Sequence, residues 1–177
     1  VDLVNKYYPN KIIETYNVLE DSTEIMLDTN GHGTHIAGTI AEGTPSNVKI
    51  IPIKVSIGSR QRITDIIAAI NYVVYYEKAD VMNMSFGSYG YSTALYNAIE
   101  SANQKNIISV AAAGNSNNSS KHYPAAFDNT ISIASVDFQL KKSSFSNYGS
   151  TIDFTAPGTA IKSTLSSNMS LSGGNDG

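Results

Sequence analysis

Cysteine and long apolar runs are both missing from this sequence. Without cysteine the chain has neither disulfide bonds nor thiol catalysis, although this does not identify its compartment. No apolar run approaches the roughly 20 residues of a membrane-spanning helix. Basic runs are missing too, and the net charge is −3, which argues against nucleic acid as the main partner. No signal peptide begins the chain, but Val1 starts as if within a domain, so this absence has little weight.

The 177 residues are enough for one domain with a sizeable core, and they are too few to favour two. Apolar strand patterns alternate with amphipathic helix patterns along the chain. The predicted strands cover residues 49–57, 80–85, 107–113, 130–136 and 152–156, with shorter candidates at 12–13 and 16–19; the predicted helices cover about 34–43, 64–78 and a segment that Ser92 caps. This alternation predicts an α/β fold with a parallel sheet covered by helices on both faces, in a single domain over residues 1–177.

The most informative stretch is NGHGTHIAGTIA, from Asn30 to Ala41. Asn-Gly favours a turn because both residues tolerate positive φ. His32 follows between two glycines, so no neighbouring Cβ shields its imidazole. We expect Thr34 to cap a helix that ends near Gly43. The face that packs consists of small residues, Ala37, Gly38 and Ala41. The acids that precede the stretch are expected to form a solvated loop: Glu20, Asp21, Glu24 and Asp28.

A histidine in this setting has two alternatives to catalysis. A lone histidine is more often a structural residue with a hydrogen bond. His32 and His35 are also spaced so that both could bind one metal ion from a single helical turn. No Glu lies between them and the chain has no Cys, so the metal interpretation is disfavoured.

Two further stretches follow predicted strands. Ser85-Phe86-Gly87 comes after one strand, and Ala111 to Asn115 (AAAGN) ends another. Ligands of open parallel sheets bind outside the carboxyl ends of the strands. Small residues there allow an extended peptide to add itself as a strand. The amide of Asn115 could serve a developing oxyanion, although a turn-forming Asn is the plainer alternative.

These stretches, in this order, resemble the motifs of the subtilisin-like serine peptidases, the subtilases. The resemblance runs from about Asp28 to Leu165. It implies a three-layer α/β fold with a mainly parallel central sheet and helices on both faces. It also implies that His32 is the general base and that Asn115 donates a hydrogen bond to the oxyanion. The residues that it places against substrate are Ser85, Phe86, Gly87, Ala112, Ala113 and Gly114. Three other segments match as scaffold and pocket wall: Tyr123-Pro124-Ala125, Phe145-Ser146 with Gly149, and 153–158.

Two elements of the family pattern are not found. The Asp-Ser/Thr-Gly turn that carries the orienting carboxylate does not occur; Asp2 lacks its setting and Asp28 is too close to His32. The nucleophile motif Gly-Thr-Ser-Met-Ala does not occur either, and Ser170 and Ser172 lie in no matching setting. We therefore expect a domain incomplete at both ends, inactive alone and poorly folded without the missing segments, a propeptide or another partner.

The resemblance also bears on metal binding and location. The family's calcium loop has no room between Glu42 and Val48, so no cofactor is expected, although weaker calcium sites elsewhere stay open. Secretion or a cell-envelope location, and a bacterial enzyme that processes a secreted peptide, follow from the resemblance alone.

Three functions remain to be compared. The leading one is a serine endopeptidase that acts on polypeptides. The alternative is a non-catalytic pseudo-peptidase that binds extended polypeptides on the same groove. A nucleotide-binding fold is disfavoured because no Gly-rich phosphate loop follows the first strand.

Overall fold

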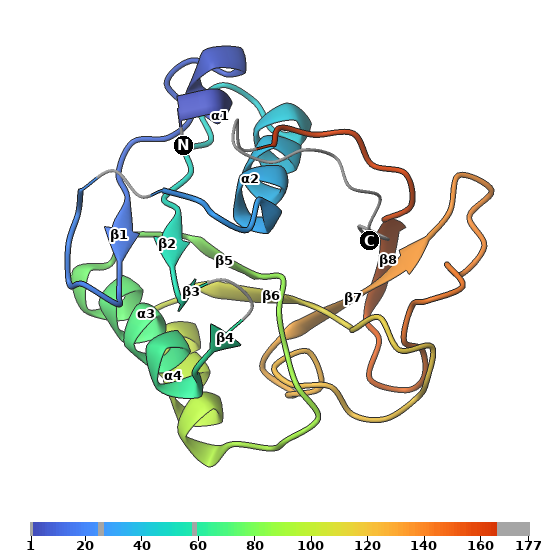
Figure 1. Ribbon diagram of the computed structural model, residues 1–177. Helices are drawn as coiled ribbons and strands as arrows, with labels where there is room; N and C mark the ends of the chain where they lie inside the picture. Colours follow the sequence, from blue (N-terminus) through green and yellow to red (C-terminus); the bar gives the residue numbers. More distant parts are fainter. Residues whose placement is uncertain (1, 25–26, 58–59, 166–177) are drawn as a thin grey trace. The chain divides into compact units, whose positions relative to one another are not determined.

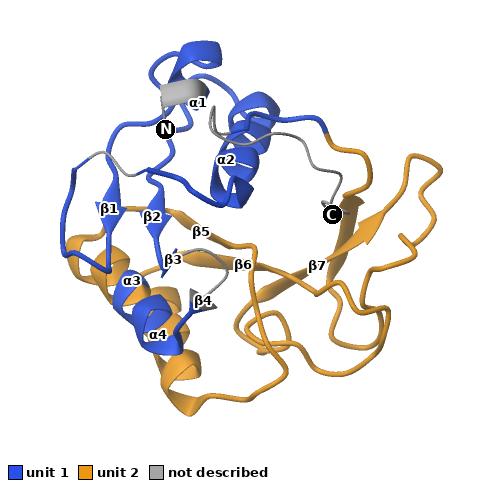
Figure 2. Ribbon diagram, in the orientation of Figure 1, with its two compact units in different colours: residues 1–69, 162–174 blue, residues 70–161, 175–177 orange. Residues whose placement is uncertain are grey.

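A computed structural model describes residues 2–24, 27–57 and 60–165 of the chain. The described residues divide into two compact units, one of residues 2–69 with 162–165 and one of residues 70–161 (Figure 2). Helix α3 (Ile63–Tyr76) begins in the first unit and ends in the second. The prediction of a single domain stays a prediction, and the two units are described in turn.

The first unit contains one long helix and several short elements (Figure 1). Its elements are α1 (Asp2–Tyr7), β1 (Tyr16–Asn17), α2 (His32–Gly43), β2 (Ile53–Lys54), β3 (Ser56–Ile57) and β4 (Arg60–Gln61). Strand β1 pairs with β2 in parallel, and β3 pairs with β4 in antiparallel. The apolar core of this unit joins α1 to α2 and consists of Val4, Ile12, Ala37 and Ala41. The small residues of α2 therefore pack as the sequence predicts.

The predicted buried strand over residues 49–57 is wrong as a continuous element. The structure has two short strands there, β2 and β3, and the side chains of 50–56 are only half-buried. Pro52 interrupts the run because it has no N–H for a ladder. Its carbonyl still accepts a hydrogen bond from the Tyr16 amide at 3.1 Å. The segment is thus an irregular edge of a small sheet.

A buried lysine closes the carboxyl end of α2. Lys11 is only 5% exposed. Its ammonium donates to the Thr44 carbonyl at 3.0 Å, the Thr44 hydroxyl at 2.8 Å and the Pro45 carbonyl at 2.6 Å. A cation at this end complements the helix dipole and satisfies carbonyls that have no partner within the helix. No pattern in the sequence predicts this role, because Lys11 is far from Thr44 along the chain.

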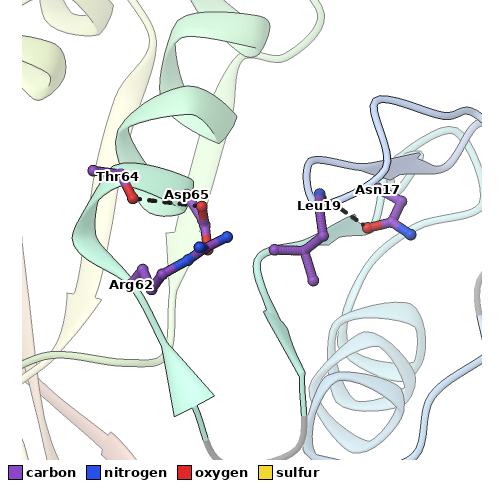
Figure 3. A network of polar contacts seen from close by, with 5 residues as sticks. All are labelled: Asn17, Leu19, Arg62, Thr64 and Asp65. Atoms are coloured by element: carbon purple, nitrogen blue, oxygen red, sulfur yellow. Dashed lines mark hydrogen bonds and ion pairs between the residues drawn. The ribbon is translucent and has the colours of Figure 1, made fainter.

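Short-range polar contacts mark the start of α3 and a turn near β1 (Figure 3). Arg62 Nε lies 2.8 Å from Asp65 Oδ2, and the Thr64 hydroxyl lies 3.5 Å from Asp65 Oδ1. The carboxylate of Asp65, in the first turn of α3, interacts favourably with the helix dipole. This agrees with the predicted start of the helix at Thr64 and Asp65. In the turn, Asn17 Oδ1 accepts a hydrogen bond from the Leu19 amide at 3.1 Å.

The second unit is built on a four-stranded parallel sheet (Figure 1). Its strands are β5 (Val81–Met84), β6 (Ile108–Ala112), β7 (Ile131–Val136) and β8 (Phe154–Pro157), paired in this order. Helix α4 (Thr93–Gln104) contacts β6. Ser92 caps this helix through a 3.2 Å hydrogen bond from the Leu95 amide, and Leu95, Ala98, Ile99 and Ala102 are buried. The predicted strands, the helix and its cap are confirmed.

The two faces of this sheet differ in burial. Strands β5, β6 and β7 alternate, and one face is buried along all three. On the opposite face Val81 is 52% exposed, its register partner Ile108 is 49% exposed, and Phe154 is 63% exposed. Parallel sheets are usually covered on both faces. This face therefore carries apolar surface that a complete α/β layer structure would bury.

Candidate active site

His32 is the first residue of α2, in the first unit. Gly31 precedes it with φ +88°, a left-handed conformation that glycine adopts at little cost. The His32 amide donates to Asn30 Oδ1 at 3.2 Å, and the His32 side chain is exposed. The expected position of the imidazole, at the amino end of a small-residue helix, is confirmed.

The cap of α2 differs from the predicted one. Thr34 lies inside the helix rather than before it, because α2 begins at His32. Gly31 occupies the N-cap position, and the carboxylate of Asp28 binds the amides around it: Oδ1 accepts from Asn30 at 2.9 Å and Gly31 at 2.8 Å. Its Oδ2 accepts from the Thr34 amide at 3.1 Å and the Thr34 hydroxyl at 2.6 Å. The prediction of Asp28 as a solvated loop acid is therefore wrong.

These bonds shift the acidity of the carboxyl group. Burial by itself raises the pKa of Asp28, but the hydrogen bonds from Thr34, Gly31 and Asn30 outweigh it. The net pKa is lower than the ordinary value of 3.8. Asp28 is therefore ionised at neutral pH, and its negative charge faces the positive end of the α2 dipole. The turn that presents His32 is fixed by a charge.

A segment from much later in the chain packs against the same helix. The Ser163 hydroxyl donates to the His35 carbonyl at 2.7 Å, and the Thr164 hydroxyl donates to the Thr34 carbonyl at 2.8 Å. Both side chains lie over Gly38, where an added Cβ would collide with Thr164 Oγ1 and lie 2.9 Å from the Thr164 amide nitrogen. The close contact between α2 and the segment of Ser163 and Thr164 therefore requires glycine at position 38.

In the second unit the two predicted substrate segments leave neighbouring strands. Strands β5 and β6 pair as far as Met84 and Ala111. Beyond that pair β5 is followed by Ser85–Gly87, and β6 is followed by Ala113–Asn115. The segment after β5 next pairs with Tyr123: the Ser88 amide donates to the Tyr123 carbonyl at 2.9 Å, and the Tyr123 amide donates back at 2.7 Å. The two segments thus begin side by side and then separate.

A buried asparagine that sequence reasoning missed holds the segment after β6. Asn147 is 2% exposed, and its Nδ2 donates to the Ala113 carbonyl at 2.9 Å. Its backbone amide donates to the Gly114 carbonyl at 2.8 Å, and its Oδ1 accepts from the Ser116 amide at 3.0 Å. Gly114 has φ +102°, and an added Cβ would lie 2.5 Å from Asn147 Nδ2. The next residue, Asn115, is exposed.

The sequence contains little signal for Asn147. It lies between Phe145-Ser146 and Gly149, which the resemblance assigns to the scaffold, but no spacing rule singles it out. His122 was also missed. Its half-buried ring lies against Gly87 and Gly114, one residue from each substrate segment.

The predicted site residues are therefore divided between the units. His32 belongs to the first, and the second brings together Ser85–Gly87, Ala112–Gly114 and Asn115. Asp2 begins α1, while Ser170 and Ser172 lie outside the described residues. Within residues 2–24, 27–57 and 60–165, no three His, Cys, Asp or Glu side chains gather as metal ligands do. None of the helices described in the same ranges has the length and apolarity needed to cross a bilayer.

Comparison with known proteins identifies the family. Residues 5–176 match the model of the Subtilase family. The chain is 39% identical over 166 residues to an alkaline proteinase of Hapsidospora chrysogena, covering 88% of this chain and 40% of that protein. It is 40% identical over 155 residues to subtilisin DY of Bacillus licheniformis, covering 80% of this chain and 56% of that protein. The chain thus spans about half the length of the curated relatives that it matches.

Solved structures confirm the predicted subtilisin-like fold class. A cold-adapted subtilisin-like serine proteinase superposes with a TM-score of 0.81 at 34% identity, covering 89% of this chain and 59% of that one. A lanthipeptide protease superposes with a TM-score of 0.85 over 96% of this chain and 59% of that one, and at 24% identity this likeness concerns the fold alone. The chain belongs to the subtilase family.

Proposed function

We propose that the protein to which these residues belong is a serine endopeptidase that cleaves polypeptides by an acyl-enzyme mechanism. The observation that carries this proposal is the pair of segments, Ser85–Gly87 and Ala113–Asn115, that begin side by side at the carboxyl ends of β5 and β6. An extended peptide can bind to their backbone, and the exposed amide of Asn115 lies in the same segment. The relatives named as proteinases support the same reaction class.

In this mechanism His32 accepts the proton of the nucleophile and returns it to the leaving amine. Its exposed position at the start of α2, fixed by the Asp28 cap, suits a group that meets both substrate and nucleophile. Asn115 donates a hydrogen bond to the oxyanion of the tetrahedral intermediate. Such a donor contributes about 10²–10³ in kcat, a magnitude measured in subtilisin itself and carried over from it. Ser85–Gly87 and Ala112–Gly114 hold the substrate backbone.

The 177 residues alone are proposed to be inactive. Neither an Asp-Ser/Thr-Gly turn nor a Gly-Thr-Ser-Met-Ala motif occurs in them, so the orienting acid and the nucleophile must come from other segments. We also propose that the chain is part of one catalytic domain, that it needs no cofactor for the chemical step, and that the protein acts outside the cytoplasm or in the cell envelope. One alternative is a pseudo-peptidase that binds extended polypeptides without cleaving them.

The test is hydrolysis of unfolded casein by the full-length protein, with new peptide termini identified by mass spectrometry. Replacement of His32 by Ala is expected to lower kcat by about 10⁶, as loss of the base does in subtilisin, the system from which this magnitude is taken. His35→Ala is the matched control on the same helix and is expected to retain activity. Binding of casein without any cleavage by the folded full-length protein would establish the pseudo-peptidase instead.

A further inference from the structure

Asn30 and Gly31 form the one Asn-Gly pair of the sequence, directly before His32. Asn-Gly pairs are prone to spontaneous deamidation, because glycine has no side chain to hinder attack by its own amide nitrogen. In this reaction the nitrogen of Gly31 loses its proton and bonds to Cγ of Asn30, and the side-chain nitrogen leaves as ammonia. Water then opens the cyclic imide to aspartate or isoaspartate. The net reaction consumes water and releases ammonia, so it requires no oxidant or other reactant.

The attacking nitrogen is held by a charged group in the folded chain. The amide of Gly31 donates to Asp28 Oδ1 at 2.8 Å, and the same oxygen accepts from the Asn30 amide at 2.9 Å. Asp28 is ionised at neutral pH because these bonds lower its pKa. A negative charge beside an N–H opposes the loss of its proton, and a hydrogen bond to an ionised acceptor is stronger than one between neutral groups. The nitrogen must give up this bond before it can attack.

The side chain of Asn30 is held as well. Its Oδ1 accepts a hydrogen bond from the His32 amide at 3.2 Å. Gly31 is buried, has φ +88° and occupies the N-cap position of α2, so its backbone is tied to the start of the helix. Closing a five-membered ring would require a rotation of this backbone or of the Asn30 side chain. Asn30 is exposed, so access of water does not limit the reaction.

We infer that Asn30-Gly31 is a latent deamidation site and that the carboxylate of Asp28 prevents its reaction in the folded protein. The modification needs no catalysis by the protein, so it does not depend on the proposed function. Only its effect on His32 rests on that function. Isoaspartate directs the main chain through Cβ and Cγ, which adds one carbon atom two residues before His32. Modification is therefore expected to displace the proposed general base.

The test is the rate at which Asn30 becomes aspartate or isoaspartate in the full-length protein at pH 8, measured by mass spectrometry of proteolytic peptides. Asn115→Ala in every protein sample limits self-digestion. A synthetic peptide of residues 27–36, which has no fixed turn, is the unprotected reference. Asn30 is expected to react at least about tenfold more slowly in the protein with native Asp28 than in the peptide. Asp28→Ala is expected to raise the rate about tenfold, the factor that one hydrogen bond to a charged group supplies.

Two further variants separate the effect of the charge from a general loosening of the fold. Asp28→Asn keeps an oxygen that can accept from Gly31 but has no charge, so its rate is expected to lie between those of native Asp28 and Asp28→Ala. Gly38→Ala perturbs the packing of Thr164 on α2 and leaves Asp28 in place, so folded Gly38→Ala is expected to react no faster than the native sequence.

Equal rates with native Asp28 and with Asp28→Ala would overturn the inference, as would native Asn30 reacting as fast as the peptide. An acceleration by Gly38→Ala as large as that by Asp28→Ala would also contradict it, because loosening alone would then explain the effect. The proposed function is judged separately, by casein hydrolysis without the Asn115 substitution. Slow deamidation in a folded protein that never cleaves casein contradicts that function and leaves the inference supported.

Discussion

Two regions of the molecule hold a candidate catalytic residue, His32 at the start of α2 and Asn115 after β6. In each region a polar side chain, half-buried at α2 and buried after β6, binds the neighbouring backbone groups. At α2 this side chain is the carboxylate of Asp28, which accepts from three amides within six residues of it. After β6 it is the neutral amide of Asn147, which both donates and accepts, and whose partners precede it by 31 and 34 residues. The hydrogen bonds of Asp28 therefore involve a charged group and residues close to it in the sequence. Those of Asn147 involve an uncharged group and residues that only folding brings near it.

The two side chains differ in their response to pH. Protonation of Asp28 weakens the cap that presents His32, because the neutral acid has less to offer amide donors and a helix dipole. Asn147 has no proton to gain in the same range, although the His122 ring that lies against Gly114 does. Each substitution that follows is made in the full-length protein.

The largest effect is expected where α2 meets the segment of Ser163 and Thr164. Gly38→Ala places a Cβ against the Thr164 side chain and backbone, so the segment must move or the helix must shift. We expect a loss of about 3 kcal/mol in the free energy of unfolding, measured by urea denaturation. Gly43→Ala is the matched control at the end of the same helix, where an added Cβ meets nothing within 4 Å. It is expected to be neutral or slightly stabilising, and equal losses in the two variants would contradict the packing of residues 163–164 on α2.

An intermediate effect is expected at Asn147. Asn147→Ala leaves the Ala113 carbonyl and the Ser116 amide without their partner, at a cost of about 2 kcal/mol in the free energy of unfolding. The Tyr89 hydroxyl also contacts Asn147 and the His122 ring lies against Gly114. The loss is therefore measured in a His122→Gln background, where it is expected to be the same at pH 7 and pH 3.5. Asn97→Ala, on the exposed side of α4, is the control and is expected to change stability little. A loss at Asn147 that varied with pH would remove the contrast with Asp28.

The smallest effect is expected at Asp28, and it depends on pH. Because the pKa of Asp28 is lower in the folded protein than its ordinary 3.8, its stabilisation is fully present above that value. It is lost as the pH falls through the lowered pKa. Asp28→Asn removes the charge and is therefore expected to cost about 0.5 kcal/mol at pH 7, and the difference from the native protein is expected to shrink below pH 4. Glu20→Gln, at an exposed residue of the turn after β1, is the control and is expected to change stability little. A constant difference for Asp28→Asn across this range would exclude the charged cap.

Periodicity and motifs predicted the elements that carry the site, because each of these elements depends on residues close together in the sequence. Helix α4 and its Ser92 cap, strands β5 to β7, and α2 with its small packing face each follow from residues within a few positions of one another. The family motifs likewise are contiguous stretches, so they placed Ser85–Gly87 after β5 and Ala111–Asn115 at the end of β6.

The parts that the sequence did not predict depend on long-range contacts. Lys11 closes the end of α2 across 33 residues, and Asn147 reaches Ala113 across 34. Neither contact leaves a pattern in its own neighbourhood. The Thr34 cap was misplaced for another reason. Gly31 at positive φ lets α2 begin two residues earlier, so Thr34 lies in the first turn and its own amide donates to the carboxylate of Asp28. No motif marks His122, because the two glycines that its ring contacts lie on separate segments of the chain.

The most direct measurement is the rate at which an alkyl fluorophosphonate labels the full-length protein, with and without the imidazole of His32. We expect stoichiometric labelling of the native and His35→Ala proteins and no detectable labelling of folded His32→Ala, because the nucleophile is activated by this one base. Labelling of His32→Ala at the native rate would show that the exposed histidine at the start of α2 is not the general base.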